Sequence, residues 1–220
     1  MENDFTLRSR YLDQYKDIYG DNVYLSSIDL VKDKINTIKG GTELTAFYHL
    51  IKDCGDCEHI NPKIDFGSGN ANANIIFITE SKIQENNENF SSLTSDEHQL
   101  IDKILSAINL AREDIYFSNI LKYTSDKDSY STEIGIQICE FHFQKHLELI
   151  NPTLVVAFGK DVGNKLLKID ESIENLNSKI HIIGNFKLMV TYHPKTILKN
   201  PKLKQAIWQD FKNIRDNYLD

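Results

Sequence analysis

Residues 74–79 read Asn-Ile-Ile-Phe-Ile-Thr, and this short apolar run between polar residues predicts a buried β-strand. Two similar stretches follow at Asp114–Leu121 (DIYFSNIL) and Thr153–Phe158 (TLVVAF). Amphipathic segments between them predict helices at Ser95–Ile108 and Thr132–Ile150. Near-continuous apolar strands that alternate with helices indicate a parallel sheet covered on both faces. The sequence therefore predicts a three-layer α/β/α fold with a central, mostly parallel sheet.

Further elements extend this pattern toward both ends of the chain. One helix is predicted from an N-cap at Thr42 to Asp53, and another follows Gly159 through Leu167. Strands are predicted at Ile180–Ile183 and Lys187–Tyr192, and a closing helix at Lys202–Tyr218. We expect residues 1–40 to form a helical N-terminal extension that packs on the core. Residues 41–220 are expected to form the principal domain, which carries the candidate site.

The composition suits one domain with a substantial core, since 40% of the 220 residues are hydrophobic. No apolar run approaches the roughly 20 residues that a membrane-spanning helix needs. The first ten residues lack the hydrophobic segment of a signal peptide. We therefore expect a cytoplasmic protein, without membrane contact, that acts as a monomer.

The charge of the chain argues only mildly about partners. A net charge of -7 disfavours extended, non-specific binding to nucleic acid, but local charge decides phosphate contact. The most basic stretch runs from His193 to Lys204 and holds four lysines and no acidic residue. Taken alone, this run is best explained as a solvated basic face.

Three strand ends carry polar residues of chemical interest: Glu80 with its neighbours Thr79 and Ser81, Asn119, and His193. Each has an ordinary structural explanation, as a helix cap, a turn residue or a partly buried histidine. Because parallel strands bring their carboxyl ends to one edge of a sheet, their joint placement favours a common cleft.

A carboxylate, an amide and an imidazole together suit the hydrolysis of an N-glycosidic bond. The amide of Asn119 can both donate to and accept from the edge of a base. His193 can donate a hydrogen bond to the base oxygen that gains negative charge as the base leaves. Glu80 can stabilise a cationic sugar or orient water. The chain shows no Ser/His/Asp triad and no phosphate-binding loop, which disfavours an unrelated small-molecule hydrolase.

Residues 54–208 resemble the iron–sulfur type (family 4) uracil-DNA glycosylases. The resemblance rests on an ordered series of motifs: Cys54-Gly55-Asp56-Cys57, Phe66-Gly67-Ser68-Gly69, Ile78-Thr79-Glu80, Tyr116-Phe117-Ser118-Asn119, Cys139, Val155-Val156-Ala157-Phe158-Gly159, Val190-Thr191-Tyr192-His193-Pro194, Asn200-Pro201 and Trp208. It implies the fold of that family and an enzyme that removes a base from DNA and leaves an abasic site.

The resemblance also implies a role for each site residue. Glu80 would position water or stabilise the sugar cation, Asn119 would read the base, and His193 would stabilise the leaving base. Further contacts to the base would come from Thr79, Ser81 and either Phe90 or Leu93. The segment after His193 would enter the minor groove of the DNA, with Ile197 and Leu198 as wedges. Further DNA contacts would come from Lys122, Lys195, Thr196 and Lys199, with the lysines on phosphates. The target base must leave the stack, because its glycosidic bond is inaccessible within a duplex.

The cysteines depart from the family pattern. Three ligands of a 4Fe-4S cluster match, Cys54, Cys57 and Cys139, but Tyr123 stands where the fourth cysteine is expected. Four thiolates are the normal set. Either His59 or His142 substitutes, or the cluster is labile or absent. The alternative is three buried cysteines without a metal, although a reducing compartment favours a metal or redox role for a Cys-x-x-Cys pair.

The pocket departs from the family as well, since Thr79-Glu80-Ser81-Lys82 replaces a Gly-Glu-Ala-Pro-Gly turn. A reshaped, more polar pocket leaves the base open: uracil, or a hydroxymethylated or glucosylated cytosine of phage DNA, which would imply antiviral defence. A second hypothesis is a catalytically weak DNA-binding protein that reads a damaged or modified base. Retention of Glu80, Asn119 and His193 favours the enzyme, and the altered turn favours the reader.

Overall fold

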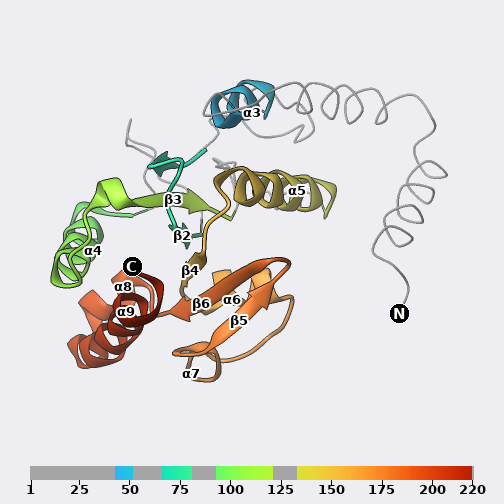
Figure 1. Cartoon of the computed structure of the whole chain (residues 1–220). Coiled ribbons are helices and arrows are strands. Elements are labelled where there is room, and N and C mark those ends of the chain that lie inside the picture. The colour runs from blue at the N-terminus through green and yellow to red at the C-terminus, as the bar shows by residue number, and fades with distance from the viewer. Residues whose placement is uncertain (1–42, 52–65, 81–92, 121–132, 220) are drawn as a thin grey trace, which may run out of the picture. The chain divides into compact units, whose positions relative to one another are not determined.

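The computed structural model describes residues 43–51, 66–80, 93–120 and 133–219 (Figure 1). The chain divides into two units, Met1–Leu50 and Ile51–Asp220. The helix expected near the end of the first unit is present as α3 (Glu43–Ile51). The expected N-terminal extension, residues 1–40, lies outside the described residues.

The second unit is built on one six-stranded sheet with the order β1-β3-β2-β4-β6-β5. The four central strands β3, β2, β4 and β6 are parallel, and the edge strands β1 and β5 are antiparallel to their neighbours. The strands in chain order are β1 (Ser68–Gly69), β2 (Ile75–Thr79), β3 (Ile115–Asn119), β4 (Leu154–Phe158), β5 (Ile180–Ile183) and β6 (Phe186–Thr191). The predicted mostly parallel sheet is confirmed, and β1 is an additional strand that the sequence did not predict.

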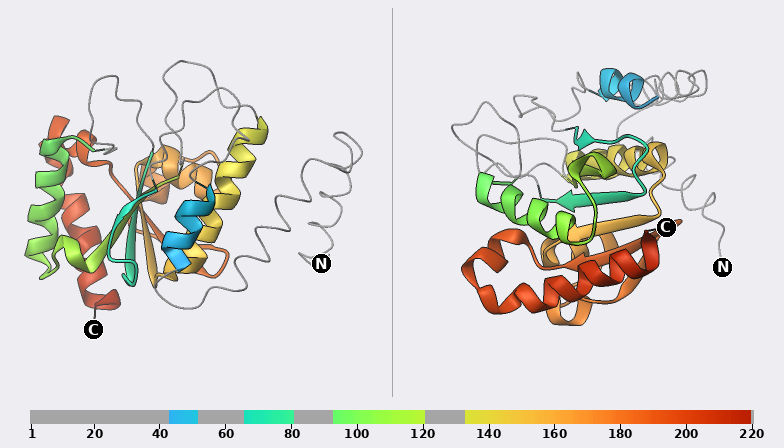
Figure 2. Two further views of the ribbon diagram at one scale, coloured as in Figure 1. Left: turned by 90° about the horizontal axis from the view of Figure 1, so that it is seen from above. Right: turned by 60° about the vertical axis from the view of Figure 1, so that its left-hand side comes forward.

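Helices cover both faces of this sheet, which confirms the three layers (Figure 2). One face packs against α4 (Ser95–Ala107), α8 (Pro194–Lys199) and α9 (Lys204–Tyr218). The other face packs against α5 (Glu133–Ile150) and α6 (Lys160–Leu167). Short elements complete the described chain: η1 (Arg112–Asp114), α7 (Ile173–Leu176) and η2 (Pro201–Leu203).

The carboxyl-terminal region differs from the expected single helix at Lys202–Tyr218. That helix begins at Lys204, after the 3-10 turn η2, and the separate helix α8 precedes it. Pro194 occupies the first position of α8, where the missing N–H of proline costs no helical hydrogen bond. A six-residue helix is too short to show an apolar period, so its sequence gave no helical signal.

The core between the sheet and the α4–α9 layer centres on Phe77. Its ring makes edge-to-face contacts with Phe117, Phe158 and Phe211, at centroid distances of 5.4, 5.2 and 5.8 Å. These residues come from β2, β3, β4 and α9, so one side chain joins three strands to the helix layer. Edge-to-face pairs add stabilisation beyond the burial of area.

Within the residues that the structure describes, no helix is both long and apolar enough to span a membrane.

Replacing Phe77 by alanine should therefore open a cavity at the centre of the core. We expect Phe77→Ala to lower the free energy of unfolding by about 3–5 kcal/mol, measured by denaturant titration. The matched control is Ile182→Ala on β5, since Ile182 is 65% exposed and its loss should leave stability nearly unchanged. Equal losses in the two variants would contradict this account of the core.

Candidate active site

The carboxyl ends of β2 and β3 place two predicted site residues side by side. Thr79 and Asn119 are register partners on the parallel pair, so their side chains lie on the same face of the sheet. The Thr79 hydroxyl donates a hydrogen bond of 2.5 Å to Oδ1 of Asn119. Both side chains are buried, at 2% and 3% exposure. The base-reading candidate is thus held by a neighbour.

His193 follows the end of β6 and caps helix α8. Its Nδ1 accepts a hydrogen bond of 3.1 Å from the backbone N–H of Lys195. Because a backbone N–H can only donate, Nδ1 must be the unprotonated nitrogen, and Nε2 carries the proton. The ring therefore presents Nε2–H as a donor, which is the form that can stabilise a developing negative charge.

Gly159, at the end of β4, lies against His193. Its φ of +92° is a conformation that residues with a side chain rarely adopt. An added Cβ would lie 3.6 Å from the Cβ of His193, and the Gly159 N–H donates to the carbonyl of Thr191 at 2.8 Å. The ends of β4 and β6 are therefore closely joined just before the histidine.

A buried carboxylate anchors the last residue of β6. Asp210 on α9 is 1% exposed and accepts hydrogen bonds from Thr191 Oγ1 (2.6 Å), Asn177 Nδ2 (2.6 Å) and Ser178 Oγ (2.8 Å). Burial raises the pKa of Asp210, and these three donors oppose that rise. The carboxylate joins α9 and the turn after α7 to the strand end that leads into His193.

Glu80 lies one residue beyond β2 and forms an ion pair with Lys165 of α6 at 2.6 Å. Both side chains are close to half exposed, at 45% and 44%. Exposed ion pairs add little stability, so this contact places the carboxylate without fixing it rigidly. The expected carboxylate is thus present at the same sheet edge, with a cationic neighbour.

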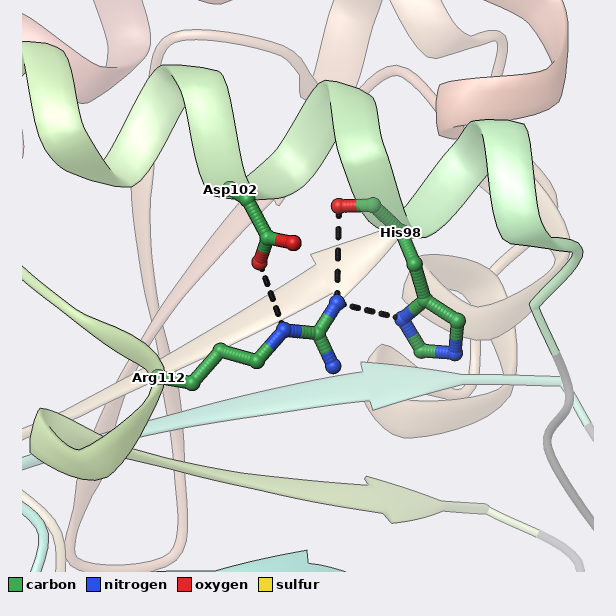
Figure 3. Close-up of polar contacts among 3 residues, drawn as sticks. All are labelled: His98, Asp102 and Arg112. Atoms are coloured by element: carbon green, nitrogen blue, oxygen red, sulfur yellow. Dashed lines mark hydrogen bonds and ion pairs between the residues drawn. The ribbon is translucent and has the colours of Figure 1, made fainter.

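Beside β3, Arg112 links the first turns of α4 to the sheet (Figure 3). Its Nε donates to Asp102 Oδ1 at 2.5 Å, and its Nη2 donates to Nδ1 of His98 at 2.7 Å. The guanidinium also lies 5.3 Å from the centre of the Phe117 ring. Burial, and then the charge of Arg112, lower the pKa of His98, while Asp102 and Glu97 oppose that shift.

The remaining predicted residues divide into three groups. Leu93 and Ile197 are buried in the core, at 4% and 0% exposure, so the structure does not support a stacking role for Leu93 or a wedge role for Ile197. Leu198 is 44% exposed and keeps the properties of a wedge. Exposed residues of α8 are Lys195, Thr196 and Lys199. The calls on Ser81, Phe90 and Lys122 fall outside the described residues.

This chain has three cysteines for the four thiolates that an iron–sulfur cluster normally takes. Cys54, Cys57 and Tyr123 lie outside the described residues, and Cys139 lies in α5. No group of three potential ligands occurs among the described residues. Three cysteines and a tyrosine do not match the four thiolates that the resemblance implies.

Comparison with known proteins places this geometry in a family. The model of the uracil DNA glycosylase superfamily matches residues 66–212. The chain belongs to this superfamily. The match spans all six strands and both helix layers, so the site described above lies within it. The suspected relationship is confirmed, and with it the prediction that the chain is a DNA glycosylase.

Individual relatives agree with this assignment. The type-4 uracil-DNA glycosylase of Archaeoglobus fulgidus is 25% identical over 74% of this chain and 87% of its own length. That of Saccharolobus solfataricus is 26% identical over 68% of this chain and 74% of its own. The type-4 enzyme of Thermotoga maritima is 25% identical over 75% and 89%. The chain is thus a divergent relative of type-4 enzymes.

Sequence reasoning missed several residues that organise the site. Lys165 lies 85 residues from its partner Glu80, and no local pattern signals such a pair. Asp210 has the ordinary appearance of a polar residue on an amphipathic helix, although its neighbours Ile207 and Phe211 mark the buried face. That a carboxylate lies within this apolar stripe was the available signal.

The burial of His98 beside Arg112 should make the stability of the protein depend on pH, because both lower the pKa of His98. Because the folded-state pKa of His98 lies below its ordinary value of 6.5, the unfolded chain takes up the proton first as pH falls. The stability that comes from the neutral form of His98 is fully present above the pKa of this histidine in the unfolded chain. It is lost as pH falls from that value toward the lower pKa of the folded state. His98→Asn keeps an acceptor near the position of Nδ1 but does not titrate.

We expect the wild-type chain to lose stability relative to His98→Asn between about pH 7.5 and pH 5, in the direction that linkage requires. The measurement is the free energy of unfolding of both proteins at several pH values. Taking the difference removes the titration of groups common to both. A difference that stays constant across this range would show that His98 does not carry the effect.

Proposed function

We propose that the chain is a monofunctional DNA glycosylase that hydrolyses the N-glycosidic bond of a flipped-out uracil and leaves an abasic site. The observation that carries this proposal is the set of side chains at one sheet edge: Asn119, Glu80 and a His193 whose Nε2 carries the proton. The type-4 relatives named above act on uracil in DNA, which supports uracil as the base.

The leaving base is the part of the reaction that this site serves best. As the glycosidic bond breaks, the electron pair passes to the base, and negative charge develops on its O2 oxygen. A preorganised donor aimed at that oxygen stabilises the transition state more than the ground state. His193 provides such a donor, since the cap to Lys195 holds the ring and keeps the proton on Nε2.

The sugar becomes cationic in the same step, and a carboxylate at the sheet edge suits that charge. Glu80 would stabilise the cation or orient the water that attacks the anomeric carbon. The water supplies the hydroxyl of the abasic product, and its remaining proton leaves with the base. No covalent enzyme intermediate is needed, in agreement with a monofunctional enzyme.

The first experiment is excision from a panel of oligonucleotides that carry uracil, hypoxanthine, hydroxymethylcytosine or glucosylated hydroxymethylcytosine, read by alkaline cleavage at abasic sites. We expect cleavage at uracil, and we expect His193→Ala to lower kcat by about 100- to 1000-fold because an oxyanion donor is lost. The matched control is His181→Ala on β5, whose Nε2 contacts the carbonyl of Leu176.

The control variant should retain wild-type activity. Cleavage of a modified cytosine but not of uracil would identify that cytosine as the substrate and would favour a role in defence against phage DNA. Intact DNA binding without cleavage of any member would favour the non-catalytic reader. Equal loss in both histidine variants would remove His193 from the chemistry.

Helix α8 is proposed to hold the DNA, because its exposed lysines and the exposed Leu198 follow directly after His193. Leu198 would enter the minor groove as a wedge, and Lys195 and Lys199 would contact phosphates. Each phosphate contact to duplex DNA contributes about 0.9 to the slope of log affinity against log salt concentration.

The double variant Lys195→Ala/Lys199→Ala should therefore reduce the magnitude of that slope by about 1.8. Affinity is measured by fluorescence anisotropy at several salt concentrations. The control is Lys103→Ala/Lys187→Ala, which removes the same charge from the middle of α4 and the amino-terminal half of β6. Equal slopes for the two double variants would place the DNA elsewhere.

A further inference from the structure

The ion pair between Glu80 and Lys165 brings a cation from helix α6 to the carboxyl edge of the sheet. Helix α6 begins directly after the carboxyl end of β4. Side chains of an α-helix lean toward its amino end, so Lys165 can extend back to that edge. Its Nζ lies 2.6 Å from Oε1 of Glu80. The lysine therefore contacts the carboxylate that the proposed reaction uses.

This ion pair lies apart from the groups that are proposed to contact the base. Thr79 and Asn119 are register partners, and they lie on the sheet face where Phe77 packs against α9. Glu80 instead pairs with α6, which packs on the other face of the sheet. The ion pair is thus placed to meet the sugar and the phosphates of a bound nucleotide rather than its base.

A lysine in this position works against the role proposed for Glu80. The carboxylate would stabilise the positive charge that develops on the sugar, and an ammonium group in direct contact offsets most of its negative charge. An enzyme gains rate only from interactions that are stronger in the transition state than in the ground state. The carboxylate is therefore most effective after Lys165 has left it. Both side chains are close to half exposed, so their separation costs little free energy.

The DNA itself supplies a group that can take Lys165 away from the carboxylate. The sugar that Glu80 would serve carries a phosphodiester anion on each side. A lysine is a compact charge on a flexible stem, so its ammonium group can move from a carboxylate to a nearby phosphate. Contact between a lysine and a DNA phosphate also releases counterions, and this favours the exchange at low salt concentration. Phosphate and carboxylate thus compete for one ammonium group.

We propose that Lys165 binds a phosphate next to the flipped-out nucleotide and thereby releases Glu80 to stabilise the sugar cation. The free protein keeps the carboxylate paired, and the bound DNA backbone unpairs it. Lys165 lies between the motifs that carry the family resemblance, Val155–Gly159 and Val190–Pro194, and belongs to neither. The inference rests on the proposed function, because that reaction gives Glu80 its role.

The test removes the charge of the lysine and keeps most of its stem. Lys165→Met is compared with Lys165→Arg, which retains the positive charge, and with the wild type. The matched control is Lys145→Met, since Lys145 forms an exposed ion pair with Glu148 near the end of α5. Helix α5 leads into the start of β4, so this control pair lies toward the amino ends of the strands. Exposed ion pairs add little stability, so all variants should fold.

The first readout is binding to a duplex with 2′-fluoro-2′-deoxyuridine, whose fluorine destabilises the sugar cation and prevents cleavage. Two further duplexes replace the phosphate on the 5′ or the 3′ side of this nucleotide by an uncharged methylphosphonate. We expect Lys165→Met to weaken binding to the first duplex about 10-fold, as the loss of one charged hydrogen bond implies. The slope of log affinity against log salt concentration should fall in magnitude by about 0.9.

The methylphosphonate duplexes identify the phosphate that Lys165 contacts. One of the two replacements should weaken binding of the wild type by about the same 10-fold and leave binding of Lys165→Met nearly unchanged, because the contact is already absent. Lys165→Arg should respond to this replacement as the wild type does. Lys145→Met should match the wild type on all three duplexes.

The exchange of partners has a second consequence that a simple phosphate contact lacks. Glu80→Gln removes the competitor for Lys165, so it should tighten binding to the first duplex by about 2- to 5-fold. The same change in the Lys165→Met background should bring no such gain. In uracil excision, Lys165→Met should raise KM and leave kcat nearly unchanged, because Glu80 is unpaired in the bound state of both proteins.

Equal methylphosphonate effects in the wild type and Lys165→Met, at both positions, would overturn the inference. A changed kcat at constant KM in Lys165→Met would overturn it too, since the lysine would then stay on Glu80 throughout. Equal losses of affinity in Lys145→Met and Lys165→Met would attribute the effect to net charge and likewise overturn it.

The binding measurements do not depend on excision, so the two proposals can fail separately. If the phosphate effect depends on Lys165 but no uracil is excised, the proposed function is refuted and the phosphate contact stands. If uracil is excised and the phosphate effect does not depend on Lys165, the inference is refuted and the proposed function stands.

Discussion

The parallel register of β3, β2, β4 and β6 positions both the apolar core and the polar residues of the candidate site. Hydrogen bonding between parallel strands sets their ends level, and the two-residue period of a strand sends alternate side chains to opposite faces. The register that places Phe77 and Phe117 side by side in the core therefore also places the residues two positions later, Thr79 and Asn119, side by side on the same face. There the apolar rows give way to Thr79, Asn119 and Thr191.

Burial at this sheet edge restricts each polar group to a small set of hydrogen-bond partners. Within the described residues, no buried side-chain nitrogen or oxygen lacks a hydrogen-bond partner. Asp210 satisfies three donors from two segments, and it could not leave its place without stranding them. Burial raises the pKa of Asp210, and the three donated hydrogen bonds oppose that rise and hold the end of β6 that leads into His193.

The chain keeps the architecture of the uracil-DNA glycosylase superfamily while changing the details around its pocket. A threonine stands at the end of β2, and only three cysteines are present. The threonine forms a side-chain hydrogen bond to Asn119 on the neighbouring strand.

The amino-acid sequence was enough to predict the layers, the order of the long elements and the residues at the strand ends. It could do so because apolar periodicity is local and because parallel strands must share an edge. It could not determine the pairing of Glu80 with Lys165, the acceptor role of Asp210 or the hydrogen bond between Thr79 and Asn119. These contacts join segments far apart in the chain, and only the packing of strands and helices brings them within hydrogen-bonding distance. Ile197 illustrates the same limit. It lies between Lys195 and Lys199 in the sequence, and no local pattern indicated that the fold would bury it.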